Sequence, residues 1–258
     1  MELLGKTALV TGGGRGIGRS CALALARAGA QVVVAARTTT EIEEVAKEIE
    51  ALGRRALAVS LDVSKLQSVE AAFQQVVEKW GGCDILVNNA GIAASAPIAK
   101  CSEELWSEIM EINLNGTFRC IKATLPTMLA RNWGRIINIA SIAGKAGAPY
   151  ISAYAASKHG VLGLTKAAAQ DVATKNITIN AICPGYVETD MGEKAMSIIM
   201  SKTNASKEQA RAALEQTTPQ KRLFQPEEVA FLAVALASPL AAGINGQAIN
   251  ICGGAIPY

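Results

Sequence analysis

The sequence predicts an α/β protein built on one doubly wound parallel sheet of about seven strands, with helices on both faces. Strand-like and helix-like segments alternate along the whole chain, which is typical of such sheets. The strand-like segments are nearly continuous apolar runs without polar alternation, as a sheet covered on both faces requires. With 258 residues, half of them apolar, the chain can bury one large core, so we expect a single domain over residues 1–258.

Each element follows from a local pattern. The predicted strands are residues 7–10, 31–35, 56–61, 84–87, 135–139, 177–182 and 248–251. The predicted helices are residues 18–28, 41–52, 69–80, 103–129 and 153–174, and a further one that begins at Pro226. Gly29 and Gly53 are placed to end helices, and Pro226 suits a first helical position. Thr38 and Glu41 have the spacing of a capping box. Residues 186–220 break the alternation with a polar, methionine-containing stretch, which we interpret as a substrate lid.

Composition excludes several classes of protein. The 25 Lys and Arg residues and 22 Asp and Glu residues leave a net charge of +3 and are scattered, so we expect no nucleic-acid partner. Six cysteines without C-x-x-C spacing and a single histidine predict no metal site and reduced, buried thiols. The first residues lack the pattern of a signal peptide, and no run reaches the roughly 18 apolar residues of a membrane span. We therefore expect a cytoplasmic protein that does not enter a membrane.

A glycine-rich turn joins the first strand to the first helix. Its spacing is G-x-x-x-G-x-G over residues 12–18. Such a turn lets the backbone approach a pyrophosphate closely, and the N-terminus of the following helix offers free N–H groups to the anion. The position between strand and helix predicts a Rossmann-type dinucleotide site. Its candidate residues are Gly12, Gly14, Arg15, Gly16, Ile17 and Gly18.

The second strand indicates which dinucleotide is bound. An NAD enzyme usually places an acidic residue after this strand, whereas this chain has Arg37. A guanidinium attracts the 2′-phosphate of NADP(H), and Arg15 can reach the same region, so NADP(H) is favoured over NAD(H). Asp62 and Val63 follow the third strand, where the adenine edge is expected, although Asp62 could instead cap the next helix.

Three further residues point to acid–base chemistry. Ser141 follows the strand over residues 135–139, and Tyr154 and Lys158 lie four positions apart on one face of a predicted helix. A positive charge about 4 Å from the phenol, at an effective dielectric constant of about 20, is worth about 4 kcal/mol, or roughly three pKa units. We therefore expect Lys158 to lower the pKa of Tyr154 into a useful range.

With these residues the chain resembles the short-chain dehydrogenases/reductases of the classical type. The matching positions are residues 11–18, Asn88-Asn89-Ala90-Gly91, Asn113, Ser141, Tyr154, Lys158, Pro184-Gly185 and Thr189. The resemblance implies that Tyr154 donates a proton to a carbonyl oxygen that Ser141 also binds. It implies that Lys158 tunes Tyr154 and holds the nicotinamide ribose, and that Asn113 fixes a water of the proton relay. It further implies cofactor contacts by Asn89, Ala90, Gly91, Tyr154, Lys158, Pro184, Gly185, Val187 and Thr189.

This resemblance implies that the substrate is a ketone. The chain is most similar to 3-oxoacyl-thioester reductases, whose substrates are linked to coenzyme A or an acyl carrier, and to ketoreductases of aromatic polyketide synthesis. Those polyketide enzymes carry Pro-Gly-Gly after Asn-Asn-Ala-Gly, whereas this chain has Ile92-Ala93-Ala94. Two alternatives stay open, a dehydrogenase of secondary alcohols or 3-hydroxy acids and a non-enzymatic dinucleotide sensor.

The lid and the assembly yield further expectations. Four lid residues could line the substrate pocket, and four cations could meet phosphate groups of a carrier or be simply solvated. The lining residues are Met191, Met196, Ile199 and Met200, and the cations are Lys194, Lys202, Lys207 and Arg211. A stripe of small residues lies along the catalytic helix, at Ala153, Ala156, Gly160, Gly163 and Ala167, and permits close approach of another element. The family resemblance implies a homotetramer.

Overall fold

The computed structural model describes residues 3–258, so Met1 and Glu2, which the domain prediction includes, lie outside the described residues. Within this range the chain forms a parallel seven-stranded sheet in the order β3-β2-β1-β4-β5-β6-β7, which confirms the predicted fold class. The strands are β1 (Thr7–Thr11), β2 (Gln31–Ala36), β3 (Ala56–Ser60), β4 (Ile85–Asn88), β5 (Gly134–Ile139), β6 (Ile177–Pro184) and β7 (Ala248–Ile251).

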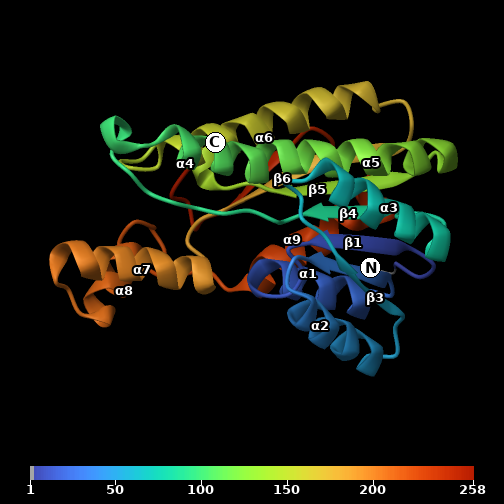
Figure 1. Cartoon of the computed structure of the whole chain (residues 1–258), viewed down its shortest axis with the longest axis horizontal. Coiled ribbons are helices and arrows are strands. Elements are labelled where there is room, and N and C mark those ends of the chain that lie inside the picture. Colours follow the sequence, from blue (N-terminus) through green and yellow to red (C-terminus); the bar gives the residue numbers. More distant parts are fainter. Residues whose placement is uncertain (1–2) are drawn as a thin grey trace.

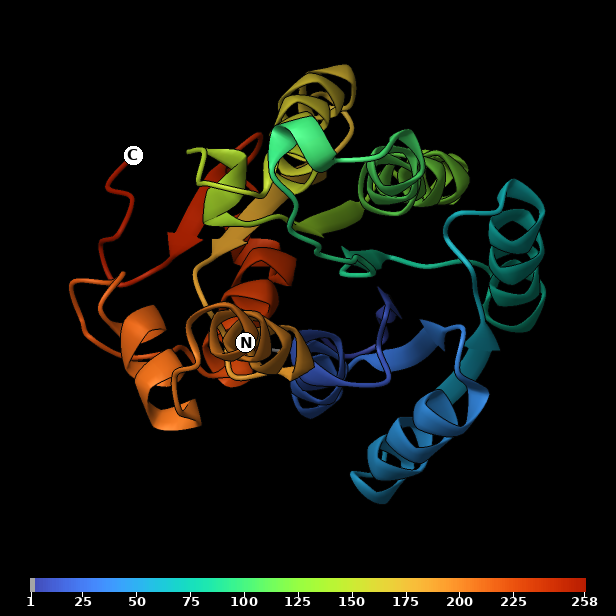
Figure 2. The ribbon, with the colours of Figure 1, turned by 60° about the vertical axis from the view of Figure 1, so that its left-hand side comes forward.

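Helices cover both faces of the sheet. Their bounds are α1 (Gly16–Arg27), α2 (Thr39–Ala51), α3 (Leu66–Trp80), α4 (Glu103–Met110), α5 (Gly116–Arg131), α6 (Ser152–Asp171), α7 (Asp190–Thr203), α8 (Lys207–Glu215) and α9 (Pro226–Ala237). Helices α1, α2 and α9 pack on one face, and α3, α5 and α6 pack on the other, with α4 against α6 (Figures 1 and 2). The crossovers therefore wind in both directions from the centre of the sheet.

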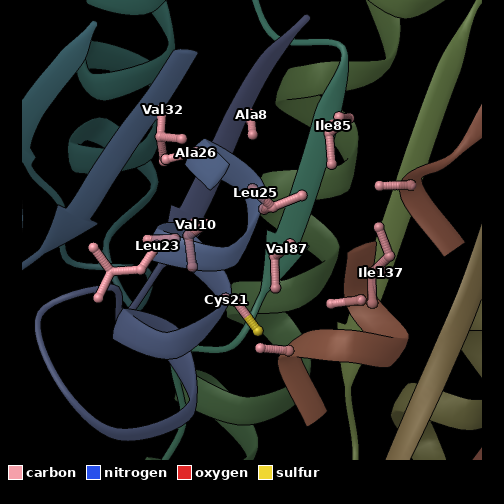
Figure 3. Close-up of a cluster of buried hydrophobic side chains, with 14 of the residues drawn as sticks. Ala8, Val10, Cys21, Leu23, Leu25, Ala26, Val32, Ile85, Val87 and Ile137 are labelled. Atoms are coloured by element: carbon pink, nitrogen blue, oxygen red, sulfur yellow. The ribbon is translucent and has the colours of Figure 1, made fainter. Parts of the chain in front are cut away.

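Alternate residues of each strand supply two separate cores. In β1, Ala8 and Val10 face α1 and α9, whereas Leu9 faces the opposite layer. Figure 3 shows the first core, where Leu25 of α1 lies beside Ile85 and Val87 of β4. Because both faces of the strands are buried, the apolar runs of the sequence have no polar alternation.

The helix predicted over residues 103–129 is interrupted. A π-helical segment, Glu111–Asn115, separates α4 from α5, and it carries Asn113. A π segment contains one extra residue per turn and is found mostly at functional sites, so residue periodicity alone does not predict it.

The helix ends agree with the predictions in most places. Gly29 and Gly53 follow α1 and α2 with φ of +109° and +74°, and Pro226 opens α9. The capping box at Thr38 was predicted wrongly, because its side chain makes no capping hydrogen bond within residues 3–258. Glu41, the other member of that box, instead faces Arg15 at 3.6 Å.

The predicted lid forms a helical hairpin. Helices α7 and α8 project from the body of the molecule (Figure 1) and share a small core of their own, formed by Met196, Ala210, Leu214 and Leu223. Val187 pairs with Phe224, so the two stems of the hairpin are held together by backbone hydrogen bonds. In the described part of the chain, no helix is both long and apolar enough to cross a membrane.

Candidate active site

The site lies where the sheet changes its winding direction. Strand β1 has β2 on one side and β4 on the other, so the loops after β1 and β4 leave toward opposite faces. Such a switch point leaves a crevice at the carboxyl ends of the strands, where ligands bind in doubly wound sheets. The glycine loop follows β1 at this edge, and Asn89-Ala90-Gly91 follows β4.

The glycine loop is shaped for close packing. Gly16 has a φ of +53°, and a Cβ added to Gly18 would overlap the carbonyl oxygen of Gly12. Asn89 ties this loop to β4, because its Nδ2 donates to the carbonyl oxygens of Thr11 and Gly12, each at 3.0 Å. The loop therefore leaves no room for larger side chains at these positions.

The N-terminus of α1 is suited to an anion. Its N-cap residue, Arg15, makes no capping hydrogen bond with its side chain to any described residue, and the first turn contains no acidic residue. The N–H groups at residues 16–18 and the positive end of the helix dipole are thus available to a phosphate group. These features fit the pyrophosphate of a dinucleotide.

The two arginines near the adenosine end have acidic neighbours. Arg15 Nη1 lies 3.6 Å from Glu41 and 3.3 Å from Asp190, the first residue of α7. Arg37 is exposed at the end of β2, and its positive charge is among the causes that lower the pKa of Asp62. A 2′-phosphate at this edge would compete with these carboxylates for both guanidinium groups.

Asp62 and Val63 have mainly local partners. The Asp62 carboxylate accepts hydrogen bonds from the backbone N–H and the hydroxyl of Ser64, at 3.0 and 2.6 Å. Helix α3 begins only at Leu66, so Asp62 does not cap it. The Val63 side chain is buried against Gly116 of α5. The Val63 carbonyl oxygen accepts a hydrogen bond from Arg119 at 3.2 Å.

Ser141, Tyr154 and Lys158 meet at the carboxyl edge of β5. Ser141 caps a short 3₁₀ segment and accepts from the N–H of Ala143 at 3.1 Å. The Lys158 Nζ donates to the carbonyl oxygen of Ile139 at 2.9 Å and lies 5.7 Å from the centre of the Tyr154 ring. Lys158 is only 6% exposed. The predicted grouping of hydroxyl, phenol and ammonium is therefore present.

The electrostatics differ from the prediction. Burial raises the pKa of Tyr154, while a hydrogen bond with Ser141 lowers it by a smaller amount. Burial lowers the pKa of Lys158 to about 8. Lys158 is not among the causes that shift the pKa of Tyr154. Its Nζ is directed to the Ile139 carbonyl oxygen and lies 5.7 Å from the centre of the tyrosine ring. The lowering of the tyrosine pKa by Lys158 was thus predicted wrongly for the free protein.

Asn113 is buried and fully bonded. Its Oδ1 accepts from the N–H of Ile92 at 2.9 Å, and its Nδ2 donates to the Ile92 carbonyl at 2.9 Å and to Ser157 at 3.0 Å. Gly91 lies beside it, since an added Cβ there would be 3.1 Å from Asn113 Oδ1 and 3.7 Å from Lys158 Nζ. Sequence analysis named Ile92 only as a departure from Pro-Gly-Gly and gave Ser157 no role. Nothing in a serine within a helical pattern marks it as a partner of a residue 44 positions away.

The stretch after β6 closes the other side of the crevice. Pro184 ends β6, and the N–H of Gly185 donates to Ile251 of β7. Thr189 lies against the glycine loop, 3.1 Å from where a Cβ of Gly16 would be. Val187 is buried in the core shared with α1 and α9. The structure therefore brings Thr189 to the glycine loop, whereas the Val187 side chain is turned into the core. Pro184 and Gly185 lie at the carboxyl end of β6, beside β7.

The lid contains apolar side chains that pack together and cations that differ in their pairing with carboxylates. Met196 is buried, with Ile199 and Met200 packed on it, and Met191 is exposed. Lys207 pairs with Glu193 at 2.8 Å, and Arg211 pairs with Glu188 and Glu215. Lys194 and Lys202 are exposed and form no salt bridge with residues of the described chain.

The cysteines of the chain are reduced and mostly buried. Five of the six cysteines are buried, all six are free, and burial raises the pKa of the Cys21, Cys83 and Cys120 thiols to about 12. Among residues 3–258, no group of His, Cys, Asp and Glu side chains is arranged to hold a metal ion.

Fold and crevice together define an oxidoreductase that uses a nicotinamide dinucleotide and acts on a C=O or CH–OH group. The family model of the short-chain dehydrogenases matches residues 6–198. A protein of Streptomyces virginiae, which carries the name of a ketoacyl reductase of monensin polyketide synthase, is 42% identical over 96% of each chain. The 3-oxoacyl-[acyl-carrier-protein] reductase of Vibrio cholerae is 40% identical over 98% of each chain. A crystal structure of an actinorhodin polyketide ketoreductase variant with NADPH has a TM-score of 0.95, at 40% identity and 98% coverage of each chain. The chain belongs to the short-chain dehydrogenase family.

Proposed function

We propose that this chain reduces a ketone to a secondary alcohol with NADPH, and that its substrate is a 3-oxoacyl thioester of coenzyme A or an acyl carrier. The observation that carries the proposal is the partly buried Tyr154 phenol, whose pKa the Ser141 hydroxyl lowers and whose ring centre lies 5.7 Å from the Lys158 Nζ. When bound, the nicotinamide supplies a hydride to the carbonyl carbon. The names of the similar proteins, which are ketoacyl and 3-oxoacyl reductases, support the same reaction.

The roles of the residues follow from their positions. Tyr154 donates its phenolic proton to the carbonyl oxygen, so that oxygen becomes the hydroxyl of the product. Ser141 donates a hydrogen bond to the same oxygen and orients it. Lys158 supplies positive charge as the phenol loses its proton, and Asn113 holds the loop at Gly91 and Ile92 in place beside it.

The proposed cofactor is NADP(H). The actinorhodin ketoreductase variant was solved with NADPH, and in this chain Arg37 stands at the end of β2, where an NAD enzyme usually has an acid. The glycine loop and the free N-terminus of α1 hold the pyrophosphate, and Asn89, Ala90 and Gly91 line the adenosine and ribose side. Pro184, Gly185, Val187 and Thr189 flank the nicotinamide, with Val187 contributing its backbone.

Arg37 tests the cofactor assignment. Replacing it with glutamine is expected to lower the ratio of kcat/KM with NADPH to kcat/KM with NADH by about 10- to 100-fold, because a hydrogen-bonded charge pair contributes about 1.5–3 kcal/mol. Steady-state kinetics with both cofactors provides the measurement. Arg27→Gln, an exposed arginine at the end of α1, is the matched control and leaves the ratio unchanged. A parent protein that prefers NADH would contradict the assignment.

The thioester assignment has two supports. The polyketide enzymes that this chain resembles carry Pro-Gly-Gly where this chain has Ile92-Ala93-Ala94, which favours the linear 3-oxoacyl class. Lys194 and Lys202 of the lid are exposed and free of salt bridges to described residues, so they are available to the phosphates of coenzyme A or a carrier.

Activity on a panel of substrates decides the function. Acetoacetyl-CoA is expected to be reduced with consumption of NADPH at 340 nm, and simple ketones without the thioester are expected to be poorer substrates. The reverse reaction is measured with 3-hydroxybutyryl-CoA and with free secondary alcohols. Faster turnover of free alcohols or hydroxy acids than of any thioester would replace the proposal with the alcohol dehydrogenase alternative, and binding of NADPH without any turnover would indicate a sensor.

We further propose a homotetramer that acts in the cytoplasm. Along α6, Leu114 of the same chain occupies the space beside Gly160. A Cβ added at Gly163 would have no atom of the described chain within 4 Å. A second face presents Phe231, 69% exposed, beside the edge strand β7. Both faces are available to other copies of the chain, and a monomer in light scattering would contradict this assembly. The six free cysteines suit a reducing compartment.

A further inference from the structure

A second hydroxyl lies within the turn of α6 that carries Tyr154 and Lys158. Ser157 is 0% exposed, and its Oγ accepts a hydrogen bond from Asn113 Nδ2 at 3.0 Å. The same hydroxyl donates to the carbonyl oxygen of Tyr154 at 2.7 Å. Ser157 therefore connects the π segment to the backbone of the proposed proton donor, and the mechanism above gives it no role.

The Asn113 amide depends on this connection. Its Nδ2 group carries two hydrogens, of which one is bonded to the Ile92 carbonyl and the other to Ser157. Asn113 is 1% exposed, so water cannot replace a lost partner without a rearrangement. Removing the Ser157 oxygen would leave a buried donor unsatisfied, which is unfavourable.

A neighbouring apolar contact acts together with this hydrogen bond. Leu114 packs on Gly160, since a Cβ added at Gly160 would lie 2.8 Å from Leu114 Cδ2. The pairs Asn113–Ser157 and Leu114–Gly160 thus join consecutive residues of the π segment to one side of α6. These two contacts hold one side of α6 against the π segment, in addition to its packing on β6 and α4.

Lys158 lies between these two contacts on α6. Its Nζ donates to Ile139 at 2.9 Å and is 3.7 Å from where a Cβ of Gly91 would be. A small rotation of α6 would break the bond to Ile139 or move the ammonium relative to Tyr154 and Gly91. The placement of the ammonium is therefore sensitive to whatever holds α6 in its present orientation.

We propose that Ser157 is a positioning residue that, by linking Asn113 to the backbone of Tyr154, sets the place of the Lys158 ammonium beside the phenol. This inference rests on the proposed function of Tyr154 and Lys158. Ser157 acts through these residues, because its hydroxyl is occupied by Asn113 and Tyr154.

The test uses Ser157→Ala, with Ser152→Ala at the start of the same helix as the matched control. The first measurement needs no turnover. In the free protein, ¹³C-lysine NMR follows the titration of Lys158, whose signal is identified by its absence in Lys158→Met. The parent pKa is expected near 8. It should rise toward 10.5 in Ser157→Ala, because a loosened ammonium becomes better hydrated, and should stay unchanged in Ser152→Ala.

The second measurement is kinetic. We expect kcat of Ser157→Ala to fall by about 10- to 100-fold while the Kd for NADPH changes by less than about threefold, because displacing a catalytic group by a fraction of an ångström slows the chemical step more than it weakens binding. Ser157→Cys keeps nearly the volume of the side chain and a weak hydrogen-bonding group, so kcat should fall less than in Ser157→Ala. The cysteine variant replaces the alanine variant in this test if the latter does not fold.

Two outcomes separate this inference from the proposed function. A Lys158 pKa and a kcat equal to those of the parent in Ser157→Ala would overturn the positioning role, even if the melting temperature fell. A parent protein that reduces no ketone would overturn the proposed function, and the NMR titration would still decide whether Ser157 places Lys158.

Discussion

Replacement of Tyr154 by phenylalanine is expected to lower kcat for ketone reduction by roughly 10²- to 10⁴-fold, the range of general acid catalysis. The phenol is the proposed proton donor, and it lies in a partly buried site where the Ser141 hydroxyl lowers its pKa. The ring itself is retained, so the packing of α6 and the affinity for NADPH should change little. Stopped-flow or steady-state measurement of NADPH consumption, with NADPH binding followed by fluorescence, separates the two effects.

The control for this variant removes the hydroxyl group of a tyrosine far from the proposed site. Tyr258→Phe makes the same chemical change at a side chain that is 77% exposed, and its kcat should equal that of the parent. If Tyr154→Phe turned over the best substrate as fast as the parent, the proposed reaction centre would be wrong. A large loss of NADPH binding would instead show that the phenol mainly holds the cofactor.

Lys158→Met is expected to abolish reduction and yet stabilise the free protein at neutral pH. Loss of the ammonium removes the charge that supports proton donation by Tyr154, so kcat should fall by at least about 10²-fold. The same charge is unfavourable in the folded state, because burial lowers the pKa of Lys158 from 10.5 to about 8. A shift of this size corresponds to a cost on the order of 3 kcal/mol, which the methionine side chain avoids.

The sign of the pH dependence follows from the lowered pKa. Below pH 8 both the folded and the unfolded chain hold the Lys158 proton, and the full cost of burying the charge is present. Between about 8 and 10.5 the folded protein has lost this proton and the unfolded chain keeps it, so the contribution of Lys158 to stability rises with pH. The stability advantage of Lys158→Met should therefore shrink across this interval. In the parent, kcat/KM for reduction should fall above about pH 8, where the ammonium is lost.

Calorimetry of parent and variant at pH 7 and pH 10 measures this difference, because the titrations of all other groups cancel between the two proteins. Lys166→Met is the matched control. It removes an exposed lysine two turns along the same helix and should leave activity and its pH profile unchanged. A variant at Lys158 that is less stable than the parent at pH 7 would contradict the cost assigned to the buried charge.

The local patterns of the sequence were sufficient to predict the class of fold. Apolar runs such as residues 31–35 and 177–182 predict strands buried on both faces, and their alternation with helices leaves a doubly wound parallel sheet as the arrangement. The glycine turn and the pair Tyr154 and Lys158 were recognisable for the same reason, since each depends on residues a few positions apart.

The sequence failed where partners are distant along the chain. Two contacts, from Asn113 to Ser157 and from Arg15 to Asp190, join elements that only the folded chain brings together. The π segment at residues 111–115 was missed for a different reason, because residue periodicity does not predict it. The separation of partners along the chain also explains the wrong prediction for the pKa of Tyr154. Spacing on a helix shows that Lys158 is near, but the direction of its ammonium is set by the Ile139 carbonyl on another strand.

By itself, the sequence determined the class of fold and predicted the cofactor edge of the sheet and the groups proposed to exchange a proton, because these follow from periodicity and residue type. Tertiary structure alone decided how far the ammonium lies from the phenol, how strongly each is desolvated and which lid lysines are free of carboxylates. These quantities depend on distance and burial, and a linear chain contains neither until it has packed.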